Sequence, residues 1–140
     1  YCEMKKNINK NIAFFLIAIL CLSCDPPHSI EFINNADSEL KVKFKIDTTI
    51  TNNDLNYVEN KKGDSIVFNI KEKDTAFLDF GIGTWSESEI RKQVNSFNTI
   101  EIENSDFKKT LKSKREMEKF LIENTEGGIG WKTKIIIEIK

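Results

Sequence analysis

The stretch that decides the fold class is ELKVKFKI, residues 39–46. The apolar side chains on one face are Leu40, Val42, Phe44 and Ile46, and the lysines on the other are Lys41, Lys43 and Lys45. This period of two is the repeat of a β-strand with one buried face, whereas a helix would scatter the same side chains around its axis. We therefore expect a half-buried strand with its apolar row in the core and its lysines in solvent.

Other runs along the chain have the same β character. They cover residues 29–34, 65–70, 75–82, 99–103 and 133–140. The last run contains three consecutive isoleucines, and β-branched residues favour strands. Lys62-Gly63-Asp64 indicates a hairpin turn in which Gly63 can take a positive φ. The polar segment 47–64 that contains this turn shows no other clear element.

Two capping boxes predict two short helices. In each box a serine hydroxyl accepts from the backbone of a glutamate three residues later, and the glutamate reaches back to the serine. The boxes are Ser86 with Glu89 and Ser113 with Glu116, and the apolar spacing that follows them predicts helices over 87–95 and 114–124. Trp85 precedes the first box and is placed to pack against Ile90 as a hydrophobic staple.

Together these patterns predict a mainly β fold. We expect about six antiparallel strands in a two-layer sandwich or an open barrel, with two short helices. The helical connections after the fourth and fifth strands could make a local parallel pair. The alternative is an α+β sheet with the helices on one face.

An export-signal pattern precedes the strands. Lysines between Met4 and Lys10 are followed by eleven apolar residues, Ile12 to Leu22, and then by Ser23-Cys24. A helix of that length spans about 16 Å, roughly half of a bilayer's hydrocarbon core, so it is too short for a stable membrane span. This order is that of a secretory signal peptide, with Met4 as the expected initiator.

The end of this segment, Cys21-Leu22-Ser23-Cys24, resembles the lipobox of bacterial lipoproteins. Ser23 fits the position before the cleavage site, whereas Cys21 stands where leucine is usual. The resemblance implies cleavage between Ser23 and Cys24 and a diacylglyceryl group on Cys24. Each buried methylene contributes about 0.8 kcal/mol to membrane residence, so two or three acyl chains give long-lived attachment.

The expected organisation is a signal peptide at 1–23, the lipidated cysteine and a tether at 24–28, and one globular domain at 29–140. A strand ending in Asn34-Asn35, the GIGTW segment at 81–85, and a late helix before an Ile-rich strand resemble small envelope lipoproteins of the Bacteroidota. This resemblance implies a membrane-anchored protein of the cell envelope, on the periplasmic or surface side of the outer membrane. It implies no particular reaction.

Composition argues against several kinds of chemistry. Lys5, Lys6 and Lys10 hold three of the 21 basic charges and Glu3 one of the 22 acidic charges, so removal of 1–23 changes the formal charge from −1 to −3. A mildly acidic chain lacks the basic surface that binds nucleic acid.

The cysteines and the single histidine are poorly placed for catalysis or metal binding. Cys2 and Cys21 leave with the signal and Cys24 carries lipid, so no thiol remains for a disulfide, a metal or a nucleophile. His28, the only histidine, lies in the expected tether and is interpreted as solvated. We therefore predict no cofactor, no metal and no enzymatic activity.

Residues 79–83 contain two features that resemble functional sites. Asp79 lies in an apolar run where burial would suit a general acid, but strand alternation favours its solvent-facing side. Gly81-Ile82-Gly83 ahead of a capped helix lacks the third glycine and the lysine of a phosphate loop, and is interpreted as a bend between strand and helix.

The two tryptophans, Trp85 and Trp131, are the candidate ligand contacts. Both lie beside glycines, and two exposed indoles on one face would form a glycan platform. A staple role for Trp85 and a packing role for Trp131 are the favoured alternatives. The function predicted is non-enzymatic, either binding of a protein or glycan or a structural role. The alternative is a small carboxylate-dependent enzyme such as a hydrolase, which buried, paired carboxylates in a cleft would favour.

Overall fold

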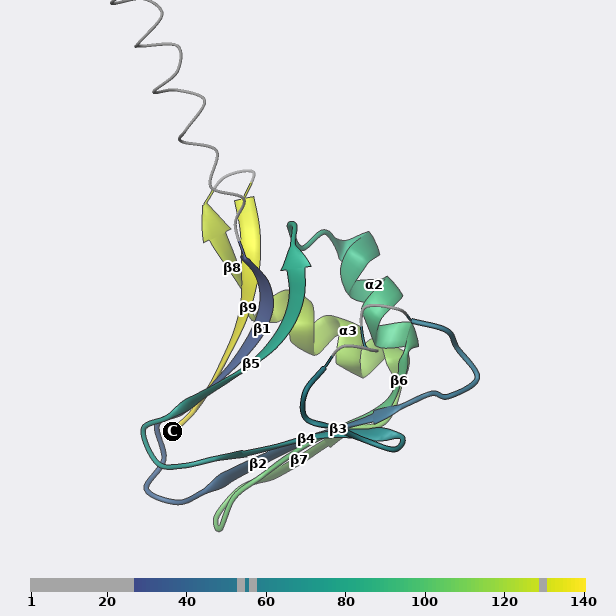
Figure 1. The fold of residues 1–140 in the computed structure, drawn as a ribbon. Coiled ribbons are helices and arrows are strands. Elements are labelled where there is room, and N and C mark those ends of the chain that lie inside the picture. Colours follow the sequence, from purple (N-terminus) through teal and green to yellow (C-terminus); the bar gives the residue numbers. More distant parts are fainter. Residues whose placement is uncertain (1–26, 53–54, 56–57, 129–130) are drawn as a thin grey trace, which may run out of the picture.

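The computed structural model describes residues 27–52, 55, 58–128 and 131–140. The predicted signal peptide, its cleavage after Ser23 and the lipidation of Cys24 fall outside these residues. In the described part the chain forms nine strands and two helices (Figure 1). The elements are β1 (Pro27–Asn34), β2 (Leu40–Ile46), β3 (Lys61–Lys62), β4 (Ser65–Ile70), β5 (Thr75–Ile82), α2 (Glu87–Asn95), β6 (Phe97–Glu103), β7 (Lys108–Leu111), α3 (Lys114–Glu123), β8 (Thr125–Gly128) and β9 (Trp131–Ile139).

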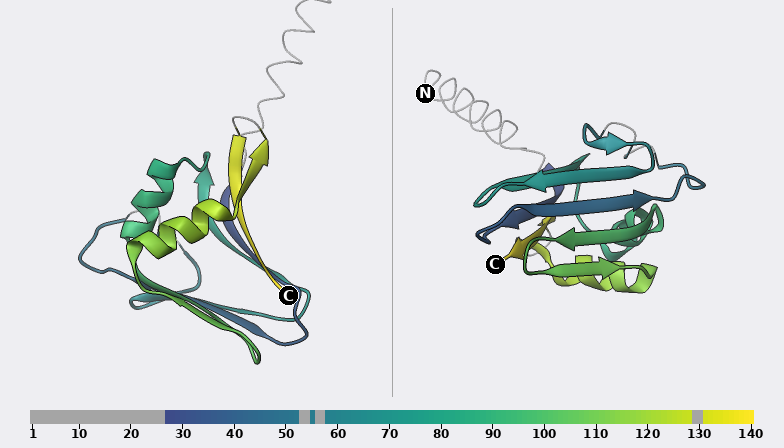
Figure 2. Two further views of the ribbon diagram at one scale, coloured as in Figure 1. Left: turned by 180° about the vertical axis from the view of Figure 1, so that it is seen from behind. Right: turned by 90° about the horizontal axis from the view of Figure 1, so that it is seen from below.

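The strands form two sheets. The four-stranded sheet has the order β5-β1-β9-β8 and the five-stranded sheet the order β3-β4-β2-β6-β7. The sheets come together where β1 leads into β2 and β4 into β5, and they diverge from this narrow end, with both helices in the open side (Figures 1 and 2). One buried apolar cluster draws on both sheets and both helices. The prediction of a mainly β, two-layer fold with two short helices is confirmed.

The alternating strand β2 lies in the middle of the five-stranded sheet. Its four apolar side chains are buried, and Lys41 and Lys45 are exposed, as predicted. Lys43 is half-buried rather than exposed. The Phe44 ring lies 5.7 Å from the Phe32 ring of the other sheet and 4.9 Å from the Phe97 ring of β6, measured between centroids, so it joins the two layers.

The parallel pair lies elsewhere than the helical connections predict. It joins the first and last strands, β1 and β9, with Ile30 opposite Ile135 and Phe32 opposite Ile137. These rows are buried, so the Ile-rich strand β9 completes the core beside β1. The strands beyond the expected six are short: β3 has two residues, and β7 and β8 have four each.

Both predicted helices are present, but only the second has a complete capping box. Helix α2 covers Glu87–Asn95 and α3 covers Lys114–Glu123. The box at Ser113 and Glu116 has both hydrogen bonds, and the Ser113 backbone N–H that donates to the Glu116 carboxylate lowers the pKa of that carboxyl. At α2 the Ser86 hydroxyl accepts from the Glu89 backbone, but the Glu89 carboxylate instead contacts Lys92 and Gln93.

The end of α2 is held by a residue from the next helix. The Lys114 ammonium donates to the carbonyls of Val94, Asn95 and Phe97. The Val94 and Asn95 carbonyls lie at the negative end of the helix dipole, where a cation is stabilising. Arg91 of α2 also pairs with Glu118 of α3 at 2.7 Å, so the two helices are tied together at two points.

Candidate functional site

The candidate site is a cleft between the end of β5 and the start of α2. Its volume is about 330 Å³. The residues that line it are His28, Phe80, Ile82, Gly83, Thr84, Ser86, Glu89, Lys92 and Gln93. Three strand–helix features meet here: the start of β1, the glycine-containing bend after β5, and the N-terminal turn of α2. The cleft therefore brings together His28, Gly83 and the capping residues of α2, which the sequence alone predicts to be a tether residue, part of a bend and a helix cap.

The prediction that His28 is a solvated tether residue is wrong. Strand β1 begins at Pro27, so His28 is a strand residue and its side chain is 5% exposed. Its ring lies 3.9 Å from the Trp85 ring and 5.9 Å from the Phe80 ring between centroids. A Cβ on Gly83 would lie 3.2 Å from His28 Nδ1, so glycine at this position lets the bend pass close over the imidazole.

Trp85 has a structural position, which corrects its candidacy as a ligand contact. The side chain is 3% exposed, and its indole nitrogen donates to the Ser29 carbonyl at 3.0 Å. Its backbone N–H donates to the Lys132 carbonyl of β9. Trp85 and Ile90 are both buried in the same apolar cluster, as the staple prediction requires. Burial against His28 of β1 and Phe80 of β5 leaves the indole face unavailable for stacking on a sugar.

A polar network fixes the α2 wall of the cleft. Gln93 is fully buried; its amide nitrogen donates to the Glu89 carboxylate at 3.0 Å, and its oxygen accepts from Asn52 at 2.8 Å. Asn52 also donates to the Ser96 hydroxyl at 2.8 Å. Lys92 Nζ lies 3.3 Å from Glu89 Oε1. The network presents a carboxylate and an ammonium at the cleft and ties α2 to the segment after β2.

Sequence reasoning missed Gln93 and Asn52. A signal for Gln93 was present, because it lies three residues after Ile90 and beside Val94 on the apolar stripe of the helix. A polar residue on a buried stripe needs a hydrogen-bond partner. The partner, Asn52, lies 41 positions away in a segment without a clear pattern, so nothing in the sequence named it.

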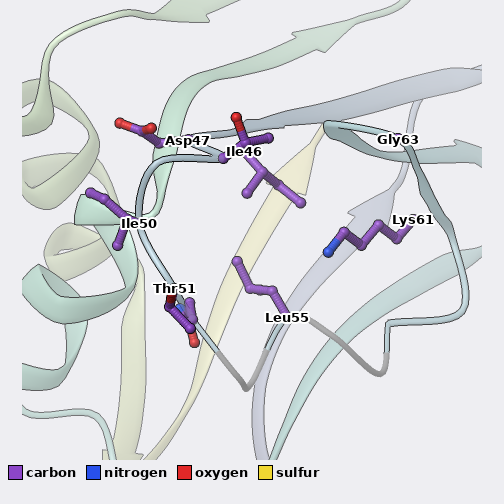
Figure 3. A pocket seen from close by; sticks show the side chains of 9 residues that line it. Ile46, Asp47, Ile50, Thr51, Leu55, Lys61 and Gly63 are labelled. Atoms are coloured by element: carbon purple, nitrogen blue, oxygen red, sulfur yellow. The ribbon is translucent and has the colours of Figure 1, made fainter.

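A second cavity, of about 260 Å³, lies beyond the end of β2 (Figure 3). The Lys61 ammonium points into it, and Leu55 forms part of its wall. Asp47 points away toward its own turn, where the carboxylate accepts from the Thr49 hydroxyl at 2.6 Å and the Thr49 backbone at 3.0 Å. These hydrogen bonds, the hydroxyl's first, lower the pKa of Asp47. The Asp47 carboxylate therefore stabilises its own turn.

Asp79 faces solvent and does not line a buried acid–base site. The Asp79 side chain is exposed, as alternation predicts, and its carboxylate accepts from the Gly81 backbone at 2.7 Å. Gly81 has a φ of +84°, a conformation open to glycine, so the bend after β5 depends on it. The third cavity, of about 340 Å³, lies between Phe77 and Asp79 of β5 and a wall formed by residues 58–60 and Phe68 of β4.

Trp131 is the one of the two candidate tryptophans whose ring is accessible. It begins β9 and is 62% exposed, which overturns the favoured packing role. Ile82, at the end of β5, is 68% exposed. The glycan platform requires two exposed indoles on one face, and the burial of Trp85 removes one of them.

Comparisons with known proteins give no match: no family model, no curated protein and no solved structure is similar to this chain. Among the described residues, no group of three or more His, Cys, Asp or Glu side chains is arranged to hold a metal ion. No helix in the described ranges is long and apolar enough to cross a bilayer.

Proposed function

We propose that this protein is a membrane-anchored envelope lipoprotein whose β domain has a binding role rather than a catalytic one. The observation that carries the proposal is the signal pattern ending in Ser23-Cys24, followed three residues after the cysteine by the first strand at Pro27. Three extended residues span at most about 10 Å. A lipid on Cys24 would therefore hold the start of β1 at the membrane surface.

The cleft beside α2 supports binding better than acid–base catalysis. Its carboxylate, Glu89, accepts from Gln93 and contacts Lys92, which makes it part of the wall. The buried carboxylate Glu31 lies on the four-stranded sheet, where it accepts from the Ser29 hydroxyl at 3.1 Å and pairs with Lys134 at 2.8 Å. Glu89 and Glu31 thus each have a structural partner, which supports a structural role for these two carboxylates over a role as a catalytic pair.

The anchor is tested by replacing the lipid-bearing residue in the full chain. Cys24→Ser should abolish acylation and leave the protein out of the membrane fraction. Mass measurement of the N-terminal peptide and detergent partition read out the result. The matched control is Cys21→Leu, which removes a cysteine but restores the usual lipobox leucine, and it should stay lipidated. A wild-type N-terminus that carries no lipid would refute the proposal.

Binding at the cleft is tested by fluorescence. A ligand in the cleft would lie against His28, whose ring is in tilted contact with the Trp85 ring, so Trp85 emission should report it. In a Trp131→Phe background Trp85 is the only tryptophan of the chain. Soluble envelope glycans are the first probes, and a saturable change that Gly83→Val removes is the expected result. Emission that stays constant over the whole titration would exclude these glycans as the ligand.

A further inference from the structure

We propose that one end of the four-stranded sheet rests on the lipid bilayer, with Ile82 and Trp131 inserted among the lipid headgroups. This end is called the anchor end and comprises Pro27, Ile82 and Trp131. The inference rests on the proposed lipid anchor at Cys24 and adds to it an orientation of the domain and the residues that contact lipid.

Strand topology brings the three residues of the anchor end together. Strands β1 and β9 are parallel, so both begin at the same end, and antiparallel β5 finishes there (Figure 1). Pro27 pairs directly with Ile82, and the pairing of Ser29 with Lys134 places Trp131 at or beyond the level of Pro27. Ile82 and Trp131 flank β1 on opposite sides, about 10 Å apart at the usual strand spacing.

The two side chains have the chemistry of a membrane contact. Ile82 and Trp131 are 68% and 62% exposed, the highest values among the exposed large apolar residues. Tryptophan is enriched at membrane–water interfaces, where its ring lies at headgroup level. Apolar groups that bind at a membrane surface enter about 5–10 Å into the boundary between headgroups and acyl chains. Of the remaining exposed apolar residues, Phe77 lies farther back on β5, opposite Glu31, and Ile50 and Phe107 lie in other segments.

The length of the tether makes this contact unavoidable if Cys24 carries lipid. Pro27 is three residues from Cys24, a reach of about 10 Å. That distance is comparable with the depth of the interfacial layer. The anchor end is therefore the part of the domain that must face the bilayer, and it also holds the two most exposed of the large apolar side chains.

Charges near the anchor end are mixed in sign. Lys132 follows Trp131, Glu126 lies on the neighbouring strand β8, and Glu87 is in the first turn of α2; all three are exposed. Such a set gives little net attraction to anionic lipid. The contact should consequently form on zwitterionic membranes and should change little with salt, unlike a polybasic surface.

The test uses the full-length, lipidated protein in phosphatidylcholine vesicles that contain lipids brominated near the headgroup. Bromine quenches tryptophan only at close range. The wild type should lose emission, and most of that loss should disappear in Trp131→Phe, which retains only the buried Trp85. Adding Phe107→Trp to this variant places an indole in the turn between β6 and β7, at the narrow end, and it should remain unquenched.

Two outcomes would overturn the inference, and they are distinguishable. If mass measurement shows lipid on Cys24 but Trp131 is quenched by aqueous acrylamide and not by brominated lipid, the anchor stands and the proposed orientation is wrong. If the N-terminal peptide carries no lipid, the proposed function fails and the inference fails with it.

Discussion

The two ends of the four-stranded sheet differ in their side-chain chemistry. At the narrow end, Asn34 is fully buried, and its amide nitrogen lies 2.8 to 3.1 Å from the carbonyls of Ser38, Ile70 and Lys71. The Lys73 ammonium adds a bond to the Asn35 carbonyl. At the anchor end, Ile82 and Trp131 are left open to solvent. Polar side chains of the domain form hydrogen bonds with the backbone carbonyls at the narrow end. At the anchor end, which follows Cys24 in the sequence, apolar side chains are exposed.

This difference in exposed apolar surface supports the proposed membrane contact of the anchor end. Single exposed apolar residues are normal in soluble domains. Here the two most exposed ones flank the same strand, β1, at the end where the chain arrives from Cys24. The narrow end exposes mainly polar groups, which water solvates well. Burial of the exposed Ile82 and Trp131 side chains in an apolar partner would be favourable.

The largest loss of stability is expected from a substitution in the core between the two ends. Phe44→Ala should lower the free energy of unfolding by about 3–5 kcal/mol, because it leaves a cavity between the sheets. Lys43→Ala on the opposite side of the same strand should change it by less than about 1 kcal/mol. Chemical denaturation of both variants measures the difference. Equal losses would mean that the sheets do not pack through this residue.

At the narrow end, Asn34→Ala should cost about 1–3 kcal/mol. The substitution leaves the buried carbonyl of Ile70 without its donor, and an unsatisfied buried group carries its full desolvation penalty. Denaturation of Asn35→Ala, whose side chain is exposed, is the control. A variant at residue 34 as stable as this control would show that the polar network does not hold the narrow end.

A smaller, pH-dependent effect is expected from Glu103, also at the narrow end. Its carboxylate contacts Lys108 at 3.0 Å and Lys41 at 3.4 Å, and the hydrogen bond from Lys108, followed by that lysine's charge, lowers the pKa of Glu103. A folded-state pKa below the unfolded one stabilises the fold above the unfolded value, and this contribution disappears as the pH falls through the folded value.

Comparison of wild type with Glu103→Gln over an acid titration tests this sign. The stability difference should be present at neutral pH and should shrink as the pH falls below the usual range of a glutamate. High salt should also reduce it, because the groups are exposed. A difference that grows on acidification would contradict the assigned ion pairs.

The smallest stability effect is expected at the anchor end. Ile82→Ser and Trp131→Ser should each change the unfolding free energy in solution by no more than about 0.5 kcal/mol, because both side chains are already largely exposed. Thermal or chemical denaturation in the absence of membranes gives the value. A loss as large as that of Asn34→Ala would show that these residues pack within the domain and are not held for a membrane.

Much of the fold could be predicted from local pattern. Strand β2 and both capped helices follow from period two and from the serine–glutamate spacing, which act over a few residues. The pairing of β1 with β9 could not be predicted, because it joins strands about a hundred positions apart and depends on how the whole core closes. Strand β8 was missed because its Gly-Gly end has no β preference.

The candidate site was less predictable than the fold. The two prolines before His28 predict a tether, yet Pro27 starts strand β1 and pairs there with Ile82 of the edge strand β5. Its burial depends on Trp85 and Phe80, which arrive from distant positions. The exposure of Ile82 and Trp131 is likewise a property of the strand ends, and it appears only once parallel pairing places those ends together.

The most direct test of the account places one probe at each end of the four-stranded sheet. Ile82→Cys and Asp37→Cys each introduce a single free thiol into a mature chain in which Cys24 is proposed to be lipidated, and each can carry a spin label. Collision with oxygen, which concentrates in lipid, and with a water-soluble nickel chelate reports the surroundings of the label in vesicles. The account predicts high oxygen and low nickel accessibility at 82 and the reverse at 37. Equal nickel accessibility at both positions, on protein shown to be lipidated, would contradict it.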